Sequence, residues 1–141
     1  MNNIALKSIV IVLFLYMIGQ NFVLAADSSS AVIHLSQDEF MQKIAADTSN
    51  KEVAVIDVRT VREFNQGHIA GAVNLPHFEI MNNISLLDEY QEKDMVFYCH
   101  TGVRVKELTD YLQEIGYGGG KLYHLKGDIR AWRARHLPLQ K

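Results

Sequence analysis

The sequence predicts an α/β domain with one central, mostly parallel β-sheet flanked by helices. Short apolar runs typical of strands alternate along the chain with stretches whose apolar residues recur at helical spacing. Two of the runs are almost wholly apolar, as in strands buried on both faces of a parallel sheet. The length of 141 residues leaves room for one domain and little more. We therefore expect a single domain over residues 32–141.

The first half of this domain predicts strand, helix, strand, helix and a short strand. Residues 32–35 are expected to be extended, and residues 36–39 form a capping box that begins a helix. Residues 53–58 predict a buried strand, and residues 60–63 form a second capping box. A turn-rich segment leads to a short strand at residues 72–75, which ends at a proline.

The second half repeats the alternation. Residues 95–99 predict a third buried strand, and residues 103–115 predict a helix with apolar residues at helical spacing. Gly116 is expected to end that helix. A last strand at residues 121–125 and a last helix at residues 128–134 follow. A parallel sheet is the arrangement that accommodates this repeated order.

Residues 1–25 have the pattern of a secretory signal peptide. A lysine precedes ten consecutive apolar residues at 9–18, and residues 23–25 offer the small side chains that a signal peptidase requires. The competing interpretation is an uncleaved membrane anchor, but ten residues span only about half of a ~30 Å hydrocarbon layer. We expect cleavage, a linker over residues 26–31, a periplasmic location and no stable membrane association afterwards.

Composition excludes several classes of partner and cofactor. With 14 Lys and Arg against 16 Asp and Glu, the formal charge of −2 gives no basic footprint for nucleic acid. The single cysteine excludes an internal disulfide and any multi-thiolate metal site. The six histidines lack metal-ligand spacing, so we expect no metal. We also expect a monomer.

The single cysteine, Cys99, stands in a chemically informative segment. It ends a predicted strand directly before a helix, where open α/β sheets place their ligands. Gly102 allows the backbone to turn its N–H groups toward the sulfur, while the helix start and Arg104 add positive charge. These features favour the thiolate, which is the nucleophilic form. The alternative is a buried structural cysteine followed by an ordinary turn glycine and a solvated arginine.

Residues 99–104 resemble the active-site loop Cys-x-x-Gly-x-Arg of the rhodanese (thiosulfate sulfurtransferase) family. Residues 56–76 resemble the first signature of that family, and residues 125–139 resemble its carboxyl-terminal signature. The resemblance covers about residues 32–139. Within the family, the chain resembles the small exported single-domain members of bacteria. One departure is Asp128, which stands where the family usually has a second glycine.

The resemblance implies a two-step sulfur transfer without cofactor. The Cys99 thiolate attacks the outer sulfur of thiosulfate, sulfite leaves, and a persulfide remains on Cys99. Cyanide or a thiol then removes the outer sulfur and restores the thiolate. The residues expected to bind the substrate and its anionic sulfur are those of the loop itself: His100, Thr101, Gly102, Val103 and Arg104.

Other functions compete with sulfur transfer. A Cys-dependent phosphatase or arsenate reductase would use five residues between cysteine and arginine, whereas four separate Cys99 from Arg104. A thiol oxidoreductase would need a second cysteine. A non-catalytic rhodanese-like binding module of the cell envelope stays open as the alternative of a different class. Asp57 and Arg59 are expected to be structural, and Trp132 to belong to the core.

Overall fold

The computed structural model describes residues 31–49 and 52–141. The predicted signal peptide at 1–25 and the linker at 26–31 lie outside the described residues, except for Ala31. In the part of the chain that is described, none of the helices has the length and apolar character needed to cross a membrane.

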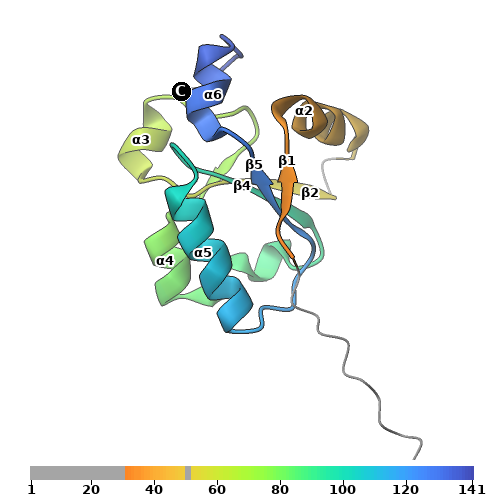
Figure 1. Cartoon of the computed structure of the whole chain (residues 1–141), viewed down its shortest axis with the longest axis vertical. Helices are drawn as coiled ribbons and strands as arrows, with labels where there is room; N and C mark the ends of the chain where they lie inside the picture. The colour runs from red at the N-terminus through yellow and green to blue at the C-terminus, as the bar shows by residue number, and fades with distance from the viewer. Residues whose placement is uncertain (1–30, 50–51) are drawn as a thin grey trace, which may run out of the picture.

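The described strands form one sheet in which every neighbouring pair is parallel. The sheet has five strands in the spatial order β1 (Ile33–Leu35), β5 (Leu122–Leu125), β4 (Asp94–Tyr98), β2 (Val53–Asp57) and β3 (Val73–Asn74). Each predicted strand is present to within one or two residues, and the predicted α/β class is confirmed (Figure 1).

Helices connect the strands. The described helical segments are α2 (Gln37–Ala46), α3 (Val61–Asn65), α4 (His77–Asn82), the 3₁₀ helix η1 (Ile84–Tyr90), α5 (Val103–Glu114) and α6 (Asp128–Ala134). Both predicted capping boxes are present, with Ser36 and Thr60 as N-cap residues. The helices α4 and η1 were not predicted, because both are short and Pro76 gives α4 no side-chain cap.

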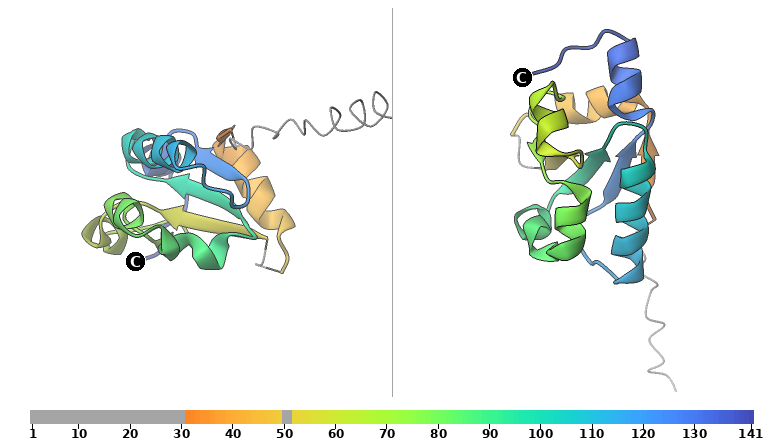
Figure 2. Two further views of the ribbon diagram at one scale, coloured as in Figure 1. Left: turned by 90° about the horizontal axis from the view of Figure 1, so that it is seen from below. Right: turned by 90° about the vertical axis from the view of Figure 1, so that its left-hand side faces the viewer.

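The sheet separates two hydrophobic cores. On one face, alternate residues of β2 and β4 pack against α4, η1 and α5; on the other face, the intervening residues pack against α2 and α6. Figures 1 and 2 show α4 and α5 side by side, with α2 across the sheet from them. The alternation follows from the two-residue period of a strand, and it decides to which face each residue of β4 points.

Candidate active site

Cys99 follows the last residue of β4 and points to the α5 face of the sheet. It shares that face with Met95 and Phe97, two and four residues earlier on the strand, and with Val105 of α5. Only 1% of the residue is exposed. The cysteine therefore lies deeper than the sequence suggested, at the floor of the loop that follows it.

A main-chain donor reaches the buried sulfur. The N–H of Gly102 donates a hydrogen bond to Cys99 Sγ over 3.0 Å. Gly102 has a φ of +94°, a left-handed conformation that glycine adopts without steric cost. A Cβ at this position would also lie 3.1 Å from Asp128 Oδ2 and 3.2 Å from a carbon of the His124 ring. Both the conformation and the space require glycine, as the sequence predicted for this loop.

The start of α5 adds a favourable electric field at the sulfur. The helix begins at Val103, as predicted, and Gly102 caps it without a side-chain hydrogen bond. The positive end of a twelve-residue helix thus lies at the residue that donates to Sγ. Main-chain N–H groups and a helix amino terminus both interact favourably with negative charge, so the loop can accommodate an anionic group at this point.

Arg104, the last residue of the loop, is held by Glu63 of α3. Its Nη1 donates to Glu63 Oε2 over 2.7 Å, and its Nη2 donates to Oε1 over 2.8 Å. The hydrogen bond to Glu63 is the largest influence that raises the pKa of Arg104, and the nearby Cys99 sulfur adds to it. The guanidinium therefore lies close to the Cys99 sulfur, and its direction is fixed by Glu63, a residue expected only to form part of a capping box.

The Glu63 carboxylate accepts hydrogen bonds from two residues, Arg104 and Thr60. Besides Arg104, it accepts hydrogen bonds from the N–H and the hydroxyl of Thr60, over 3.0 and 2.8 Å. The hydrogen bond from Arg104 is the largest cause that lowers the pKa of Glu63 far below its ordinary value, and the Thr60 bonds act in the same direction. Glu63 is therefore ionised at neutral pH, and it fixes α3 beside the Cys99 loop.

The remaining predicted loop residues present their side chains to solvent. His100 and Thr101 are exposed, and Val103 is 64% exposed. The structure thus brings Cys99, Gly102 and Arg104 together, and it leaves the other three as the outer rim of the loop. Their expected contribution to substrate binding stays a prediction.

Asp57 and Arg59 form a buried ion pair away from the sulfur. The Arg59 guanidinium lies 2.6 Å from Asp57 Oδ2 through Nη2, and Nη2 also donates to the Gly67 carbonyl over 3.0 Å. The Asp57 side chain is fully buried, and 2% of the Arg59 side chain is exposed. The contacts expected of both residues are present: Asp57 pairs with Arg59, and Arg59 ties the end of β2 to the loop after α3.

Asp128 is the residue of this region that sequence analysis missed. Its Oδ1 accepts a hydrogen bond from the Cys99 N–H over 2.7 Å, and its Oδ2 lies 3.1 Å from His124 Nε2. Asp128 keeps the left-handed conformation, with a φ of +53°, that a second glycine would adopt there. The sequence feature that could have pointed to Asp128 is its place where the family usually has a second glycine.

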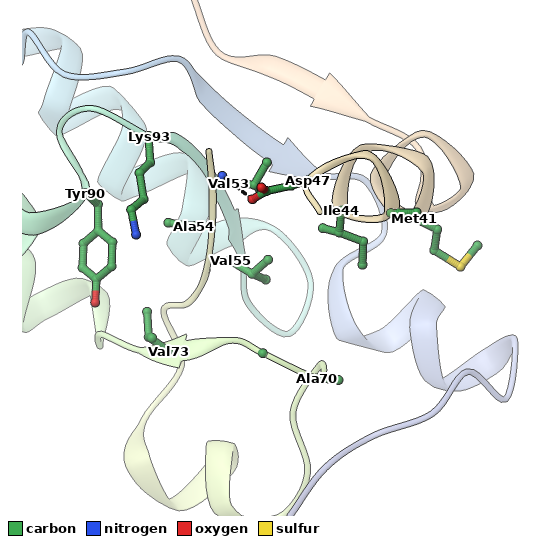
Figure 3. Close-up of a pocket in the computed structure, with 12 residues that line it drawn as sticks. Met41, Ile44, Asp47, Val53, Ala54, Val55, Ala70, Val73, Tyr90 and Lys93 are labelled. Carbon is green, nitrogen blue, oxygen red and sulfur yellow. Dashed lines mark hydrogen bonds between the residues drawn. The ribbon is translucent and has the colours of Figure 1, made fainter. Parts of the chain in front are cut away.

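Two hollows adjoin the sheet, one far from the Cys99 loop and one beside it. A groove of about 650 Å³ lies between α2, β2 and β3, and its lining includes Val53 and Lys93 at the amino ends of β2 and β4 (Figure 3). It therefore lies toward the amino ends of these strands, whereas Cys99 lies at the carboxyl end of β4. A second hollow, of about 620 Å³, adjoins the Cys99 loop and is lined by Thr101, Gly102 and His124 among others. Across residues 31–49 and 52–141, His, Cys, Asp and Glu form no group of three that could hold a metal ion.

Comparison with known proteins places this geometry in a family. Residues 36–135 match the family described as Rhodanese-like domain. The chain belongs to this family. The resemblance of the Cys99 loop and its flanking signatures is thereby confirmed, and so is the single rhodanese-like domain with its parallel sheet.

Rhodanese-like relatives include sulfurtransferases. The chain is 35% identical over 101 residues to a protein named "Sulfurtransferase" from Allochromatium vinosum, covering 72% of this chain and 89% of that protein. It is 32% identical over 103 residues to "Thiosulfate sulfurtransferase GlpE" from Shewanella oneidensis, covering 73% and 94%. A rhodanese-related protein of Thermoplasma volcanium, 22% identical, has a similar fold with a TM-score of 0.62 over 77% of this chain and 97% of that one.

Proposed function

We propose that this rhodanese-like protein is a thiosulfate sulfurtransferase that carries the transferred sulfur as a persulfide on Cys99. The observation that carries the proposal is the 3.0 Å hydrogen bond from the Gly102 N–H to Cys99 Sγ, at the start of α5. A donor aimed at the sulfur stabilises the anionic thiolate before the reaction and the anionic persulfide after it. A cysteine used only for packing has no need of such a donor.

The first half-reaction forms one S–S bond and breaks another. The Cys99 thiolate attacks the outer sulfur of thiosulfate, and the electron pair of the broken S–S bond leaves with sulfite. The three negative charges of thiolate and thiosulfate reappear as one on the persulfide and two on sulfite. In the second half-reaction, cyanide or a thiolate takes the outer sulfur and regenerates the Cys99 thiolate, which gives ping-pong kinetics.

Arg104 supplies the charge that a dianionic donor requires. Its guanidinium lies beside Cys99 and carries a permanent positive charge, and the partly exposed Arg104–Glu63 pair remains accessible to a small anion. In this proposal Arg104 attracts thiosulfate and the departing sulfite, and Glu63 holds the guanidinium in place between turnovers. The main-chain donors hold the sulfur atoms, so the arginine acts on the sulfonate end of the substrate.

Sulfur uptake by the isolated protein tests the proposal. The protein without residues 1–25 is incubated with thiosulfate, and its intact mass is measured together with the sulfite released. We expect a mass increase of one sulfur atom and release of one equivalent of sulfite. Added cyanide should then remove the sulfur atom as thiocyanate and restore the original mass. Because the chain has one cysteine, the position of the added sulfur is unambiguous.

Cys99→Ser is the matched control, since it keeps the size of the side chain and removes the nucleophile. The variant is expected to fold normally and to gain no sulfur. If the wild-type protein also gains none, from thiosulfate or from a persulfide donor, the binding module of the cell envelope becomes the better interpretation.

We further propose that the enzyme works in the periplasm as a monomer. The support for export is the apolar run and the small residues before the expected cleavage site. Cell fractionation followed by amino-terminal sequencing of the mature protein tests the location, and light scattering of the purified protein tests the monomer. A cytoplasmic protein that retains Met1 would contradict the first expectation, and a stable dimer would contradict the second.

A further inference from the structure

We infer that Asp128 is a positioning residue for the Cys99 nucleophile, and that His124 holds Asp128 in place. The inference rests on the proposed sulfur transfer and adds to it a residue on a different element, α6. Three observations carry it: two hydrogen bonds between the start of α6 and the main chain of Cys99, the position of Asp128 Oδ2 beside Gly102, and the backbone conformation of Asp128.

The main chain of Cys99 is held at both of its polar groups by the start of α6. The Cys99 N–H donates to Asp128 Oδ1 over 2.7 Å, and the Cys99 carbonyl accepts from the Ile129 N–H over 3.2 Å. With its N–H and its carbonyl both bound, the Cys99 backbone has little freedom to rotate. The direction of the Cα–Cβ bond is thereby fixed, and the hydrogen bond from the Gly102 N–H to Sγ then favours one rotamer about that bond.

The same carboxylate also borders the residue that donates to the sulfur. A Cβ on Gly102 would stand 3.1 Å from Asp128 Oδ2 and 3.2 Å from a carbon of the His124 ring. The carboxylate and the ring therefore occupy the space beside Gly102. Asp128 thus binds the main chain of Cys99 and lies next to Gly102, the two residues that the Sγ to N–H hydrogen bond joins.

His124 completes the support from β5. Its Nε2 lies 3.1 Å from Asp128 Oδ2, and its ring packs edge to face against His34, with centroids 5.2 Å apart. Asp128 is 1% exposed, so its two oxygens are directed by these protein contacts. A buried carboxylate with both oxygens in contact with fixed partners has a single orientation, which is what a positioning role requires.

The backbone of Asp128 indicates that the carboxylate is retained at a cost. Its φ of +53° is a conformation that glycine adopts freely and that Asp and Asn adopt at a smaller cost than other residues. Asp128→Gly would remove this strain and, with it, the acceptor for the Cys99 N–H. A residue needed only for the turn would be replaced by glycine without loss, so the inference predicts lower activity from a substitution that relieves strain.

The experiment measures the second-order rate constant of sulfur uptake from thiosulfate at a temperature where each variant is fully folded. We expect Asp128→Gly to lower it by about tenfold, the effect of losing one charge-assisted hydrogen bond. Asp128→Asn keeps an acceptor oxygen and tolerates the same conformation, so we expect a rate constant within about threefold of wild type. Amide hydrogen exchange at Cys99 is expected to be faster in the Gly variant and unchanged in the Asn variant.

His136→Gly is the matched control. His136 is exposed after the end of α6 and has a φ of +55°, so this substitution relieves the same strain without touching the Cys99 loop. Sulfur uptake is expected to stay at the wild-type rate. If Asp128→Gly does not fold, His124→Leu serves instead. This variant removes the contact between His124 Nε2 and Asp128 Oδ2, and we expect it to lower the rate constant of sulfur uptake by about threefold.

The outcomes separate this inference from the proposed function. Absence of sulfur uptake by the wild-type protein would contradict the proposed function, while the amide exchange measurement would still test the support of Cys99 by Asp128. Wild-type uptake together with an equal rate constant in Asp128→Gly, or in His124→Leu where the Gly variant does not fold, would overturn the inference.

Discussion

Glu63 and Arg104 face each other through two parallel hydrogen bonds, 2.7 and 2.8 Å long, although 41 positions separate them in the sequence. The pair joins the amino-terminal turn of α3 to the first turn of α5. It therefore fixes the only charged side chain of the segment 99–104 that lies beside the sulfur of Cys99. Several measurable consequences follow from this pair and from the buried groups around it.

Arg104→Ala is expected to lower kcat/KM for thiosulfate by about 30- to 100-fold, because a charge-assisted contact to the dianion is lost. Steady-state kinetics with thiosulfate as the varied substrate measure this effect. Arg104→Lys keeps the charge and loses the two-point geometry, so its kcat/KM should lie between those of the wild type and the alanine variant. Equal constants for wild type and Arg104→Ala would remove Arg104 from the substrate site.

The Glu63 carboxylate should make stability depend on acid pH. Its pKa is lowered in the folded protein, so its contribution is fully present above the ordinary carboxyl value of 4.5 and is lost as the pH falls below it. Glu63→Gln lacks this contribution. We expect the variant to be less stable at pH 7 by up to about 1 kcal/mol, as for a partly exposed ion pair.

Urea denaturation of both proteins between pH 7 and pH 2 provides the measurement. The difference in the free energy of unfolding between wild type and Glu63→Gln should shrink steadily below pH 4.5. A difference that stays constant over that range would show that Glu63 does not titrate as the geometry requires.

Asp57→Asn should be among the most destabilising substitutions in the domain. It leaves the Arg59 guanidinium buried without its counter-charge, which costs about 3–5 kcal/mol. The exposed pair of Lys106 and Asp110 offers a comparison, since Asp110→Asn removes an ion pair one helical turn apart and should cost less than about 0.5 kcal/mol. Chemical denaturation measures the free energy of unfolding of both variants. Losses of similar size in Asp57→Asn and Asp110→Asn would contradict the expected cost of breaking the buried pair.

Gly102→Ala should reduce sulfur uptake by about tenfold or more, because the added Cβ meets Asp128 and His124 and displaces the donor to the sulfur. Gly71→Ala is the control for backbone strain alone. Gly71 has a φ of +77°, and a Cβ there would meet nothing within 4 Å. Both variants should lose stability, and only Gly102→Ala should lose activity in the intact-mass assay. Loss of activity in both, or in neither, would disprove the role of the contact.

The order of elements and the place of Cys99 between a buried strand and a helix could be predicted from the sequence. Capping boxes, apolar runs and glycines act over a few residues, so Ser36, Thr60 and Gly102 indicated local structure without knowledge of the fold. The short helices α4 and η1 escaped prediction. Ile80 and Leu87 pack these helices onto the core, and helices of six and seven residues are too short to give a clear periodic pattern in the sequence.

The sequence by itself therefore determined that Cys99 lies at the carboxyl end of a buried strand, directly before a glycine turn and a helix. Tertiary structure decided what surrounds it: the depth of the sulfur, the pairing of Arg104 with Glu63, and the hydrogen bond from the Cys99 N–H to Asp128, 29 positions away. The physical reason is range. Local hydrogen bonds and the spacing of apolar residues involve only a few neighbouring positions. The contacts around Cys99 form only when the parallel strands align and bring the starts of α3, α5 and α6 together at the carboxyl ends of the strands.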